Sequence, residues 1–374
     1  MRAMILTCNT GQGHNSCAKA IQEVYDAEGV ECRIVDALSF VSKGFSKLTA
    51  WGHVAIYRHI PGLFCWGYDF TARHPRIFLK NSPFYMLLAS GAERLRCALV
   101  DGQYDTVICV HVFSGLMVKA MLEKHPMPLK TCFVDTDYTS SPGAQQNGLA
   151  HYFLADEALK PECQALGVDM ARVICSGIPI RQAFYARQDQ SEAKEAMGIP
   201  PGHLHLLMMC GSMGCGPMEK LLALVSRGMD ENWVVTVVCG TNIRLRRRLE
   251  RRYAQNPAIR ICGYEECMAQ LMYSADLYLT KPGGISVSEA AAVGLPMVYI
   301  NAVAGCEAHN CRFFTQLGGG ATEPDVPGLA RLCLALMEDE SRRDRMRQAL
   351  QARPRINSAR MIYRMMAETP VSAG

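Results

Sequence analysis

The segment Lys281-Pro282-Gly283-Gly284-Ile285-Ser286-Val287-Ser288-Glu289 carries the clearest structural signal in this chain. It follows a strand-like run at 276–280 and opens a helix of small residues at 287–293, just before Gly294-Leu295-Pro296. Such a strand, glycine turn and helix direct free backbone N–H groups and the positive end of a helix dipole toward a phosphate. The alternative is an ordinary turn that uses glycine for its torsional freedom.

A second glycine loop, 211–216, lies between a predicted strand at 204–210 and a predicted helix at 218–227. It lacks the GK[ST] ending of a P-loop, so it does not indicate a nucleoside triphosphatase. The two loops together predict a site for a diphosphate. Glu289 is then placed to accept hydrogen bonds from ribose hydroxyls, or it simply complements the helix dipole.

Strand-like and helical segments alternate through both halves of the chain, which predicts parallel α/β sheets with helices on both faces. A length of 374 residues favours two domains, because a single core rarely exceeds about 250–300 residues. We predict an N-terminal domain at 1–180, a C-terminal domain at 181–340 and a last helix at 341–374 that crosses back to the first domain. The predicted strands are 3–8, 31–36, 106–110, 130–134, 152–154, 172–175, 204–210, 233–239, 259–262, 276–280 and 297–300.

The composition excludes several classes of protein. A net charge of +4 gives no indication of a nucleic-acid partner, and the apolar content of 49% is that of a globular protein. No apolar run approaches the ~20 residues of a membrane-spanning helix. The 17 cysteines are scattered through apolar runs without a CxxC pair, which is typical of reduced, buried thiols in a cytoplasmic protein and not of a metal site.

One region, 40–96, is both aromatic and basic. Its aromatic residues include Trp51 and Trp66, and it holds eight lysines and arginines against Asp69 and Glu93. This mixture suits a membrane interface, where cations meet anionic lipid and rings lie at headgroup depth. It also fits a helical insertion packed on the sheet with a solvated basic face, and the two interpretations are compatible.

Candidate catalytic groups follow two N-terminal strands. His14, in Gly11-Gln12-Gly13-His14, opens a helix whose dipole lowers the pKa of an imidazole and favours the neutral form that a general base needs. A histidine that only fills the turn is the alternative. Asp135-Thr136-Asp137 follows the strand 130–134 at the sheet edge where α/β proteins bind ligands, and His111 follows another strand at the same edge. The two carboxylates are candidates to orient His14 or to bind a hydroxyl-bearing acceptor, and the alternative is that they cap the following loop.

These motifs occur in one order over residues 3–320 and resemble the monogalactosyldiacylglycerol synthase and processive diacylglycerol glucosyltransferase family, which is related to the peptidoglycan N-acetylglucosaminyltransferase. The motifs that carry the resemblance also include Gly177-Ile178-Pro179 and Glu307-Ala308-His309-Asn310. The resemblance implies a GT-B fold, in which two Rossmann-like domains face each other across a cleft. The donor then binds the C-terminal domain and the acceptor binds the N-terminal domain.

The resemblance also implies roles for individual residues. His14 and Asp137 are the catalytic candidates, with either as the base. The residues expected to bind the donor are Gly211, Ser212, Gly214, Lys281, Gly283, Gly284, Glu289, Glu307 and Asn310. Two departures leave the sugar and the acceptor open: Cys306 replaces a glutamine that the family usually has, and 138–143 lacks the family's histidine and tryptophan.

We therefore expect an inverting hexosyltransferase that moves a sugar from a UDP-sugar to a lipid such as diacylglycerol, in glycolipid synthesis. No cofactor or metal is expected, because no DxD pair follows a donor-side strand. The expected location is the inner face of the cell membrane, to which region 40–96 attaches peripherally. The alternatives are a transferase with a soluble acceptor, a UDP-sugar epimerase, and a non-catalytic nucleotide-sugar or membrane-binding regulator.

Overall fold

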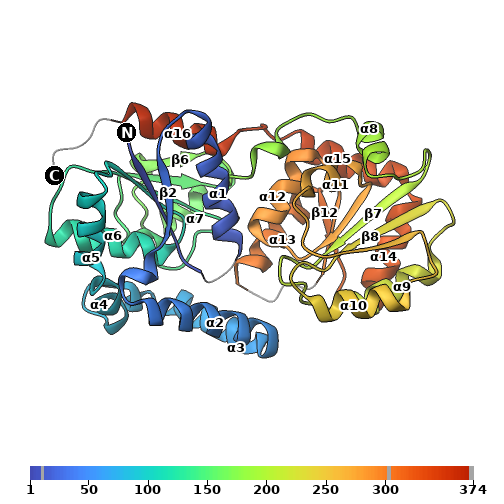
Figure 1. Ribbon diagram of the computed structural model, residues 1–374, viewed down its shortest axis with the longest axis horizontal. Helices are drawn as coiled ribbons and strands as arrows, with labels where there is room; N and C mark the ends of the chain where they lie inside the picture. The colour runs from blue at the N-terminus through green and yellow to red at the C-terminus, as the bar shows by residue number, and fades with distance from the viewer. Residues whose placement is uncertain (10–11, 301–304, 370–374) are drawn as a thin grey trace. The chain divides into compact units, whose positions relative to one another are not determined.

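The computed structural model describes residues 1–9, 12–300 and 305–369, which form two compact units. The first unit consists of Met1–Gln182 and the C-terminal segment that starts at Ile356. The second lies between Ala183 and Arg355, apart from a few residues before Glu307. Each unit is built on a six-stranded parallel sheet with helices on its faces (Figure 1). The prediction of two Rossmann-like α/β domains is confirmed.

The sheet of the first unit has the order β2-β1-β3-β4-β5-β6. Its strands are β1 (Ala3–Thr7), β2 (Cys32–Asp36), β3 (Thr106–Cys109), β4 (Lys130–Val134), β5 (His151–Leu154) and β6 (Val173–Cys175). Its helices are α1 (Gln12–Ala27), α2 (Lys43–His59), α3 (Pro61–Arg73), α4 (Pro83–Ala89), α5 (Ala92–Asp101), α6 (Val112–Lys124), α7 (Lys160–Ala165) and α16 (Ser358–Glu368). Because β1 lies between β2 and β3, the strand order reverses at β1, and open α/β sheets bind ligands at the carboxyl ends of the strands beside such a reversal.

The sheet of the second unit has the order β12-β11-β10-β7-β8-β9, so its reversal lies between β7 and β10. Its strands are β7 (Leu204–Met209), β8 (Trp233–Val238), β9 (Ile259–Cys262), β10 (Leu277–Thr280), β11 (Met297–Tyr299) and β12 (Gly320–Thr322). Its helices are α8 (Gln190–Ala196), α9 (Met218–Gly228), α10 (Ile243–Arg252), α11 (Met268–Ser274), α12 (Gly284–Val293), α13 (Cys306–Leu317), α14 (Val326–Glu338) and α15 (Glu340–Gln351). Strand β12 was not predicted, because its three residues, Gly-Ala-Thr, show no apolar pattern.

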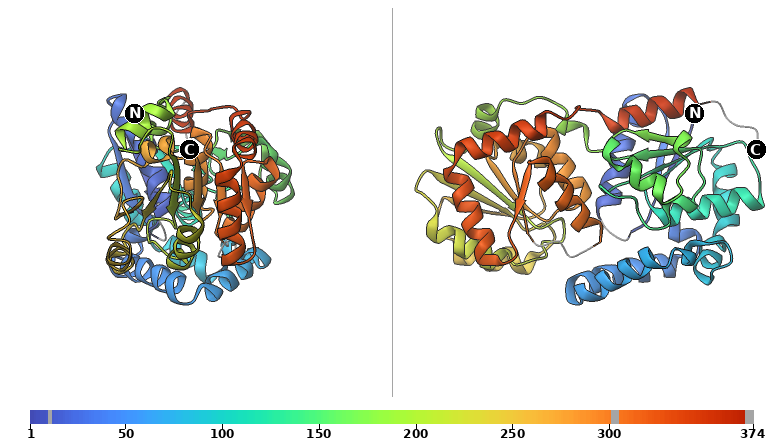
Figure 2. Two further views of the ribbon diagram at one scale, coloured as in Figure 1. Left: turned by 90° about the vertical axis from the view of Figure 1, so that its right-hand side faces the viewer. Right: turned by 180° about the vertical axis from the view of Figure 1, so that it is seen from behind.

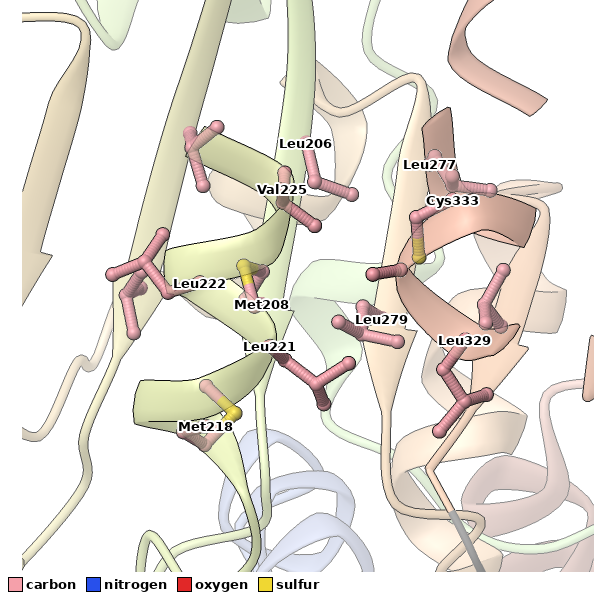
Figure 3. Packing of buried hydrophobic residues seen from close by; sticks show 14 of the residues in the cluster. Leu206, Met208, Met218, Leu221, Leu222, Val225, Leu277, Leu279, Leu329 and Cys333 are labelled. Atoms are coloured by element: carbon pink, nitrogen blue, oxygen red, sulfur yellow. The ribbon is translucent and has the colours of Figure 1, made fainter. Parts of the chain in front are cut away.

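Buried aliphatic side chains hold the second sheet to its helices. Val225 of α9 lies beside Leu206 of β7, Leu221 of α9 points toward Leu279 of β10, and Leu329 and Cys333 of α14 pack over β10 (Figure 3). All these side chains are almost completely buried. The packing fixes the two strands whose carboxyl ends carry the glycine loops. The cysteines whose side chains the structure describes are free thiols; nine of these sixteen are buried, as predicted, and seven are partly exposed.

The C-terminal segment differs from the predicted single helix at 341–374. The chain leaves the helical path between Gln351 and Ser358, where Pro354 lacks the N–H that a continuous helix requires. Helix α15 packs on α12 and α14 within the second unit. Only α16 belongs to the first unit, where it packs against α1.

Region 40–96 contains four helices, α2 to α5, and short 3-10 turns. Helices α2 and α3 pack on each other and lie together outside the sheet of the first unit (Figures 1 and 2). We call α2 and α3 the helical arm. Among the described residues, no helix is both long and apolar enough to cross a membrane.

Candidate active site

The two predicted phosphate loops lie side by side in the second unit. Strands β7 and β10 are neighbours, and Met209 pairs with Thr280 at their carboxyl ends. The loops that follow these strands therefore leave the sheet together. A Cβ added to Gly211 would lie 3.7 Å from Cε of Lys281, which shows how closely the two loops approach. The structure thus brings together the two glycine segments that the sequence predicted as one diphosphate site.

Helix α12 begins at Gly284, three residues earlier than predicted, and Gly283 is its N-cap. The N–H groups of the first turn of a helix have no partner within the helix, and Gly283 has no side chain that could accept a hydrogen bond from them. A Cβ added to Gly283 would meet no atom within 4 Å, so this helix start borders open space. Glu289 lies in the second turn and is half-buried. The arrangement has the donors and the space that a bound phosphate requires.

A close backbone approach fixes the shape of the 211–216 loop. Gly214 has a φ of +55°, and a Cβ there would lie 2.2 Å from the carbonyl oxygen of Cys239. Asn242 Nδ2 donates to the Gly214 carbonyl at 3.0 Å, and Thr241 N–H donates to the Ser212 carbonyl at 2.8 Å. The loop after β8 therefore holds this glycine loop from one side.

Lys281, Glu307 and Asn310 form a connected group at the same edge of the sheet. Lys281 Nζ and Glu307 Oε1 form an ion pair in which both side chains are largely buried. Asn310, completely buried, donates from Nδ2 to the Pro282 carbonyl at 3.0 Å. Glu307 and Asn310 are three residues apart on α13, so one helical face positions Lys281 beside Gly211.

In the first unit, His14 lies in the first turn of α1, because this helix starts at Gln12. Gly11 of the motif lies outside the described residues. The Nδ1 atom of His14 is 2.8 Å from the Val110 carbonyl oxygen. A carbonyl only accepts hydrogen bonds, so Nδ1 carries the proton and Nε2 is the unprotonated nitrogen. Burial and, to a smaller extent, the charge of the nearby His53 lower the pKa of His14 to about 4 against the opposing effect of the Val110 hydrogen bond, so the ring is neutral at pH 7.

His111 faces His14 across the point where the strand order reverses. The ring centroids are 4.6 Å apart in an edge-to-face arrangement. His111 caps α6, and its Nδ1 accepts the Phe113 N–H at 3.1 Å, so the proton of its neutral ring is on Nε2. Burial holds the pKa of His111 well below its usual value, and the charges of His14 and His53 act in the same direction. Sequence reasoning missed His53, since nothing in the helical pattern of α2 indicates its neighbours.

The loop after β4 contacts His14 through Thr136, whose Oγ1 lies 3.1 Å from Nδ1. Asp135 is completely buried and accepts hydrogen bonds from Tyr152 Oη at 2.8 Å and Ser141 Oγ at 2.9 Å. Burial, with a smaller contribution from the charge of Asp137, raises the pKa of Asp135 to about 7, although the hydrogen bonds from Tyr152 and Ser141 act in the opposite direction. Asp137 is half-buried on the same loop. Asp135 therefore organises the loop, while Asp137 is the more accessible carboxylate.

Metal ligands are not grouped anywhere in the described part of the chain: no three His, Cys, Asp or Glu side chains are arranged to hold an ion. The candidate residues instead form two separate sets, one in each unit. The second unit holds the two glycine loops with Lys281, which we call the phosphate cradle for the role predicted from the sequence, and the first holds a pair of neutral histidines beside carboxylates.

Comparison with known proteins gives these two sets a context. Residues 14–180 match the family model of monogalactosyldiacylglycerol (MGDG) synthase, and residues 205–325 match the glycosyltransferase family 28 C-terminal domain. The chain is 28% identical over 366 residues to the processive diacylglycerol beta-glucosyltransferase of Bacillus licheniformis, covering 96% of this chain and 92% of the relative. The protein of the same name from Bacillus subtilis is 27% identical over 368 residues, with 96% and 93% covered.

Solved structures share the fold. MurG from Acinetobacter baumannii superposes with a TM-score of 0.64 at 13% identity, covering 98% of this chain and 99% of MurG. The spinosyn rhamnosyltransferase SpnG gives 0.60 at 12% identity, covering 99% of this chain and 100% of SpnG. At these identities the similarity establishes the fold, which is that of GT-B glycosyltransferases. The chain thus matches a monogalactosyldiacylglycerol synthase model in its first half and a glycosyltransferase family 28 C-terminal model in its second, and it is a glycosyltransferase, as its motifs predicted.

Proposed function

We propose that this glycosyltransferase transfers a hexose from a UDP-sugar to the free hydroxyl of diacylglycerol, with inversion at the anomeric carbon. Similarity over nearly the whole chain to diacylglycerol glucosyltransferases is the observation that carries the proposal. The phosphate cradle at β7 and β10 supports a nucleotide-diphosphate donor. The neutral His14 supports activation of a hydroxyl, which an inverting transfer needs.

In the proposed reaction, Nε2 of His14 accepts the proton of the acceptor hydroxyl. The hydroxyl oxygen attacks the anomeric carbon from the side opposite the diphosphate, and the bond between that carbon and the diphosphate oxygen breaks. The Val110 carbonyl and the Thr136 hydroxyl lie within hydrogen-bond distance of Nδ1. They keep the proton on Nδ1, so Nε2 is free to accept a proton. Asp137 remains the second candidate for the base.

The leaving diphosphate gains negative charge as the glycosidic bond breaks. The N–H groups at the start of α12, the positive end of its dipole and Lys281 offer compensating charge. Glu307 holds Lys281 at the loop, and Asn310 holds the neighbouring Pro282 carbonyl. The proposed reaction needs no metal ion, which predicts that EDTA leaves the rate unchanged.

We also propose that the helical arm binds the membrane that contains the acceptor. Trp51 on α2 is 70% exposed and Trp66 on α3 is 62% exposed. Trp66, Phe70 and His74 stack one turn apart, with centroids at 5.3 and 4.4 Å, which forms a rigid aromatic ladder on an exposed helix. Further exposed apolar side chains of the arm and its connection are Leu48, Ile60 and Leu63, and nearby cations are Lys43, Lys47, Arg73 and Arg76. Exposed rings among cations are typical of a surface that enters the lipid headgroup region.

The same helix joins this surface to the catalytic residues. Helix α2 carries Trp51 on its exposed side, and two residues later it carries His53, whose charge acts on His14 and His111. Insertion of Trp51 into lipid would therefore bring the membrane to the helix that carries His53, which acts on the proposed base. This suits an acceptor whose acyl chains stay in the bilayer. Peripheral attachment to the inner face of the cell membrane follows as part of the proposal.

The test is direct. The protein is incubated with diacylglycerol in mixed micelles and UDP-glucose, UDP-galactose or UDP-N-acetylglucosamine in turn, and the products are weighed by mass spectrometry. NMR of the product then reports the anomeric configuration. A hexosyl-diacylglycerol of β configuration supports the proposal. Transfer only to soluble acceptors, or interconversion of the UDP-sugars without transfer, contradicts it.

A further inference from the structure

Helix α10 of the second unit is strongly basic, and its arginines have no role in the proposed reaction. Its ten residues contain six arginines and one glutamate. Leu245 and Leu249 are buried against the sheet and fix which side of the helix faces outward. Arg244, Arg247 and Arg251 follow one another at spacings of three and four residues, so they share the outward face, and all three are exposed.

Ion pairs divide the six arginines into two groups. Arg246 pairs with Glu250 at 2.7 Å, while Arg248 and Arg252 share Glu219 of α9 at 3.3 and 3.6 Å. Within the part of the chain that the structure describes, no carboxylate lies within ion-pair distance of the other three, which we call the arginine stripe: Arg244, Arg247 and Arg251. Ile243, at the start of the helix, is 62% exposed beside the stripe.

We propose that the arginine stripe is a second membrane-contact surface, which binds anionic phospholipid headgroups independently of the helical arm. Three guanidinium groups without an ion-pair partner among the described residues match, on one helix face, a layer of phosphates, since each presents several donors to phosphate oxygens. Arg251 uses only Nε within the helix, where it donates to the Arg247 carbonyl at 3.2 Å. The exposed Ile243 suits the boundary between headgroups and acyl chains. The phosphate backbone of a nucleic acid offers no comparable apolar layer for this aliphatic side chain. The proposal extends the proposed function, since a lipid acceptor brings the enzyme to a bilayer, but it can be tested separately.

The experiment measures co-sedimentation of the full chain with phosphatidylcholine vesicles, with and without phosphatidylglycerol. The test variant is Arg244→Ala/Arg247→Ala/Arg251→Ala. The matched control is Arg331→Ala/Arg345→Ala/Arg360→Ala, which removes the same charge from exposed positions on α14, α15 and α16. A cation near an anionic membrane surface contributes about fivefold in affinity, so the stripe variant should bind phosphatidylglycerol vesicles roughly a hundredfold more weakly.

The control variant should stay within a fewfold of the wild type, and Arg→Lys at the three stripe positions should retain most of the binding. Equal loss in the stripe and control variants would overturn the proposal, since it would show that only net charge matters. Unchanged vesicle binding by the stripe variant, together with lost binding to a homopolymeric RNA, would overturn it in favour of a nucleic-acid surface.

Activity in neutral micelles separates this proposal from the proposed function. With UDP-glucose and diacylglycerol in uncharged detergent, the stripe variant should keep the kcat and the donor KM of the wild type. A raised donor KM would assign the arginines to steering the anionic donor and would overturn the membrane assignment. Absence of transfer by the wild type would contradict the proposed function, whereas the vesicle measurements would still decide the role of the stripe.

Discussion

Replacement of Gly214 by alanine tests whether the 211–216 loop holds the donor diphosphate. Gly214 has a φ of +55°, a conformation that costs other residues about 1–2 kcal/mol. Its added Cβ would lie 2.2 Å from the Cys239 carbonyl oxygen, whereas real Cβ contacts are essentially never under 3.0 Å. The backbone must therefore separate by at least 0.8 Å, the difference between these distances. A shift of about 1 Å at a positioning group costs about a hundredfold in rate, and this is the loss in kcat/KM that we expect.

Gly202→Ala is the matched control. Gly202 also has a positive φ, +77°, but a Cβ there would meet no atom within 4 Å. It should lower the free energy of unfolding by about 1–2 kcal/mol and leave kcat/KM unchanged. Guanidinium denaturation measures the stability of both variants, and calorimetric titration with UDP measures donor binding. If folded Gly214→Ala protein binds UDP and turns over like the wild type, the assignment of this loop to the diphosphate is wrong.

Three further predictions concern individual charges. Because His14 must be neutral to act as base, kcat/KM should stay level from pH 7 down to about 5 and fall as the pH drops through about 4; a midpoint near 6.5 would contradict the buried, neutral state. Lys281→Met leaves Glu307 buried without its cation and should destabilise the protein by about 3 kcal/mol. The double variant Lys281→Met/Glu307→Gln should recover stability but not activity. A Lys281→Met protein as stable as the wild type would refute the role of this ion pair in stability. The raised pKa of Asp135 means that the folded state holds its proton more tightly than the unfolded state, so this group loses stabilising effect as the pH rises from about 4 to 7. The free energy of unfolding of Asp135→Asn should therefore rise relative to that of the wild type over that range. An equal difference between the two proteins at pH 5 and at pH 8, measured by denaturation, would contradict this prediction.

The two units place their reactive groups by the same topological rule. In each sheet the strand order reverses beside the first strand of that unit, and the loops at this reversal carry the candidate site. In the first unit these loops present His14 after β1 and His111 after β3. In the second they present the glycine loops after β7 and β10. The candidate catalytic histidines and the candidate phosphate loops thus occupy equivalent positions on two sheets.

Local patterns in the sequence were sufficient for most of the elements. Apolar runs such as 106–110 and 130–134 became strands, because burial on both faces of a parallel sheet requires continuous apolar residues. The errors occurred where the local signal is weak or ambiguous. The Gly-Ala-Thr strand β12 is too short to show a pattern. The basic helical pattern continues on both sides of Pro354, and it therefore predicts one helix where the structure has two.

The sequence by itself determined that this chain has two α/β domains, glycine loops suited to a diphosphate, and a basic aromatic region, since these depend on the order of neighbouring residues. The tertiary structure alone decided which groups meet. The tautomer of His14 depends on a carbonyl 96 residues away, and Lys281 is held by a glutamate from a later helix. The arginine stripe of α10 is likewise identified only from the tertiary structure, which shows that Glu219 and Glu250 pair with the other three arginines of the helix. Such contacts arise from strand order and helix packing, which bring together residues whose distance along the chain carries no local signal.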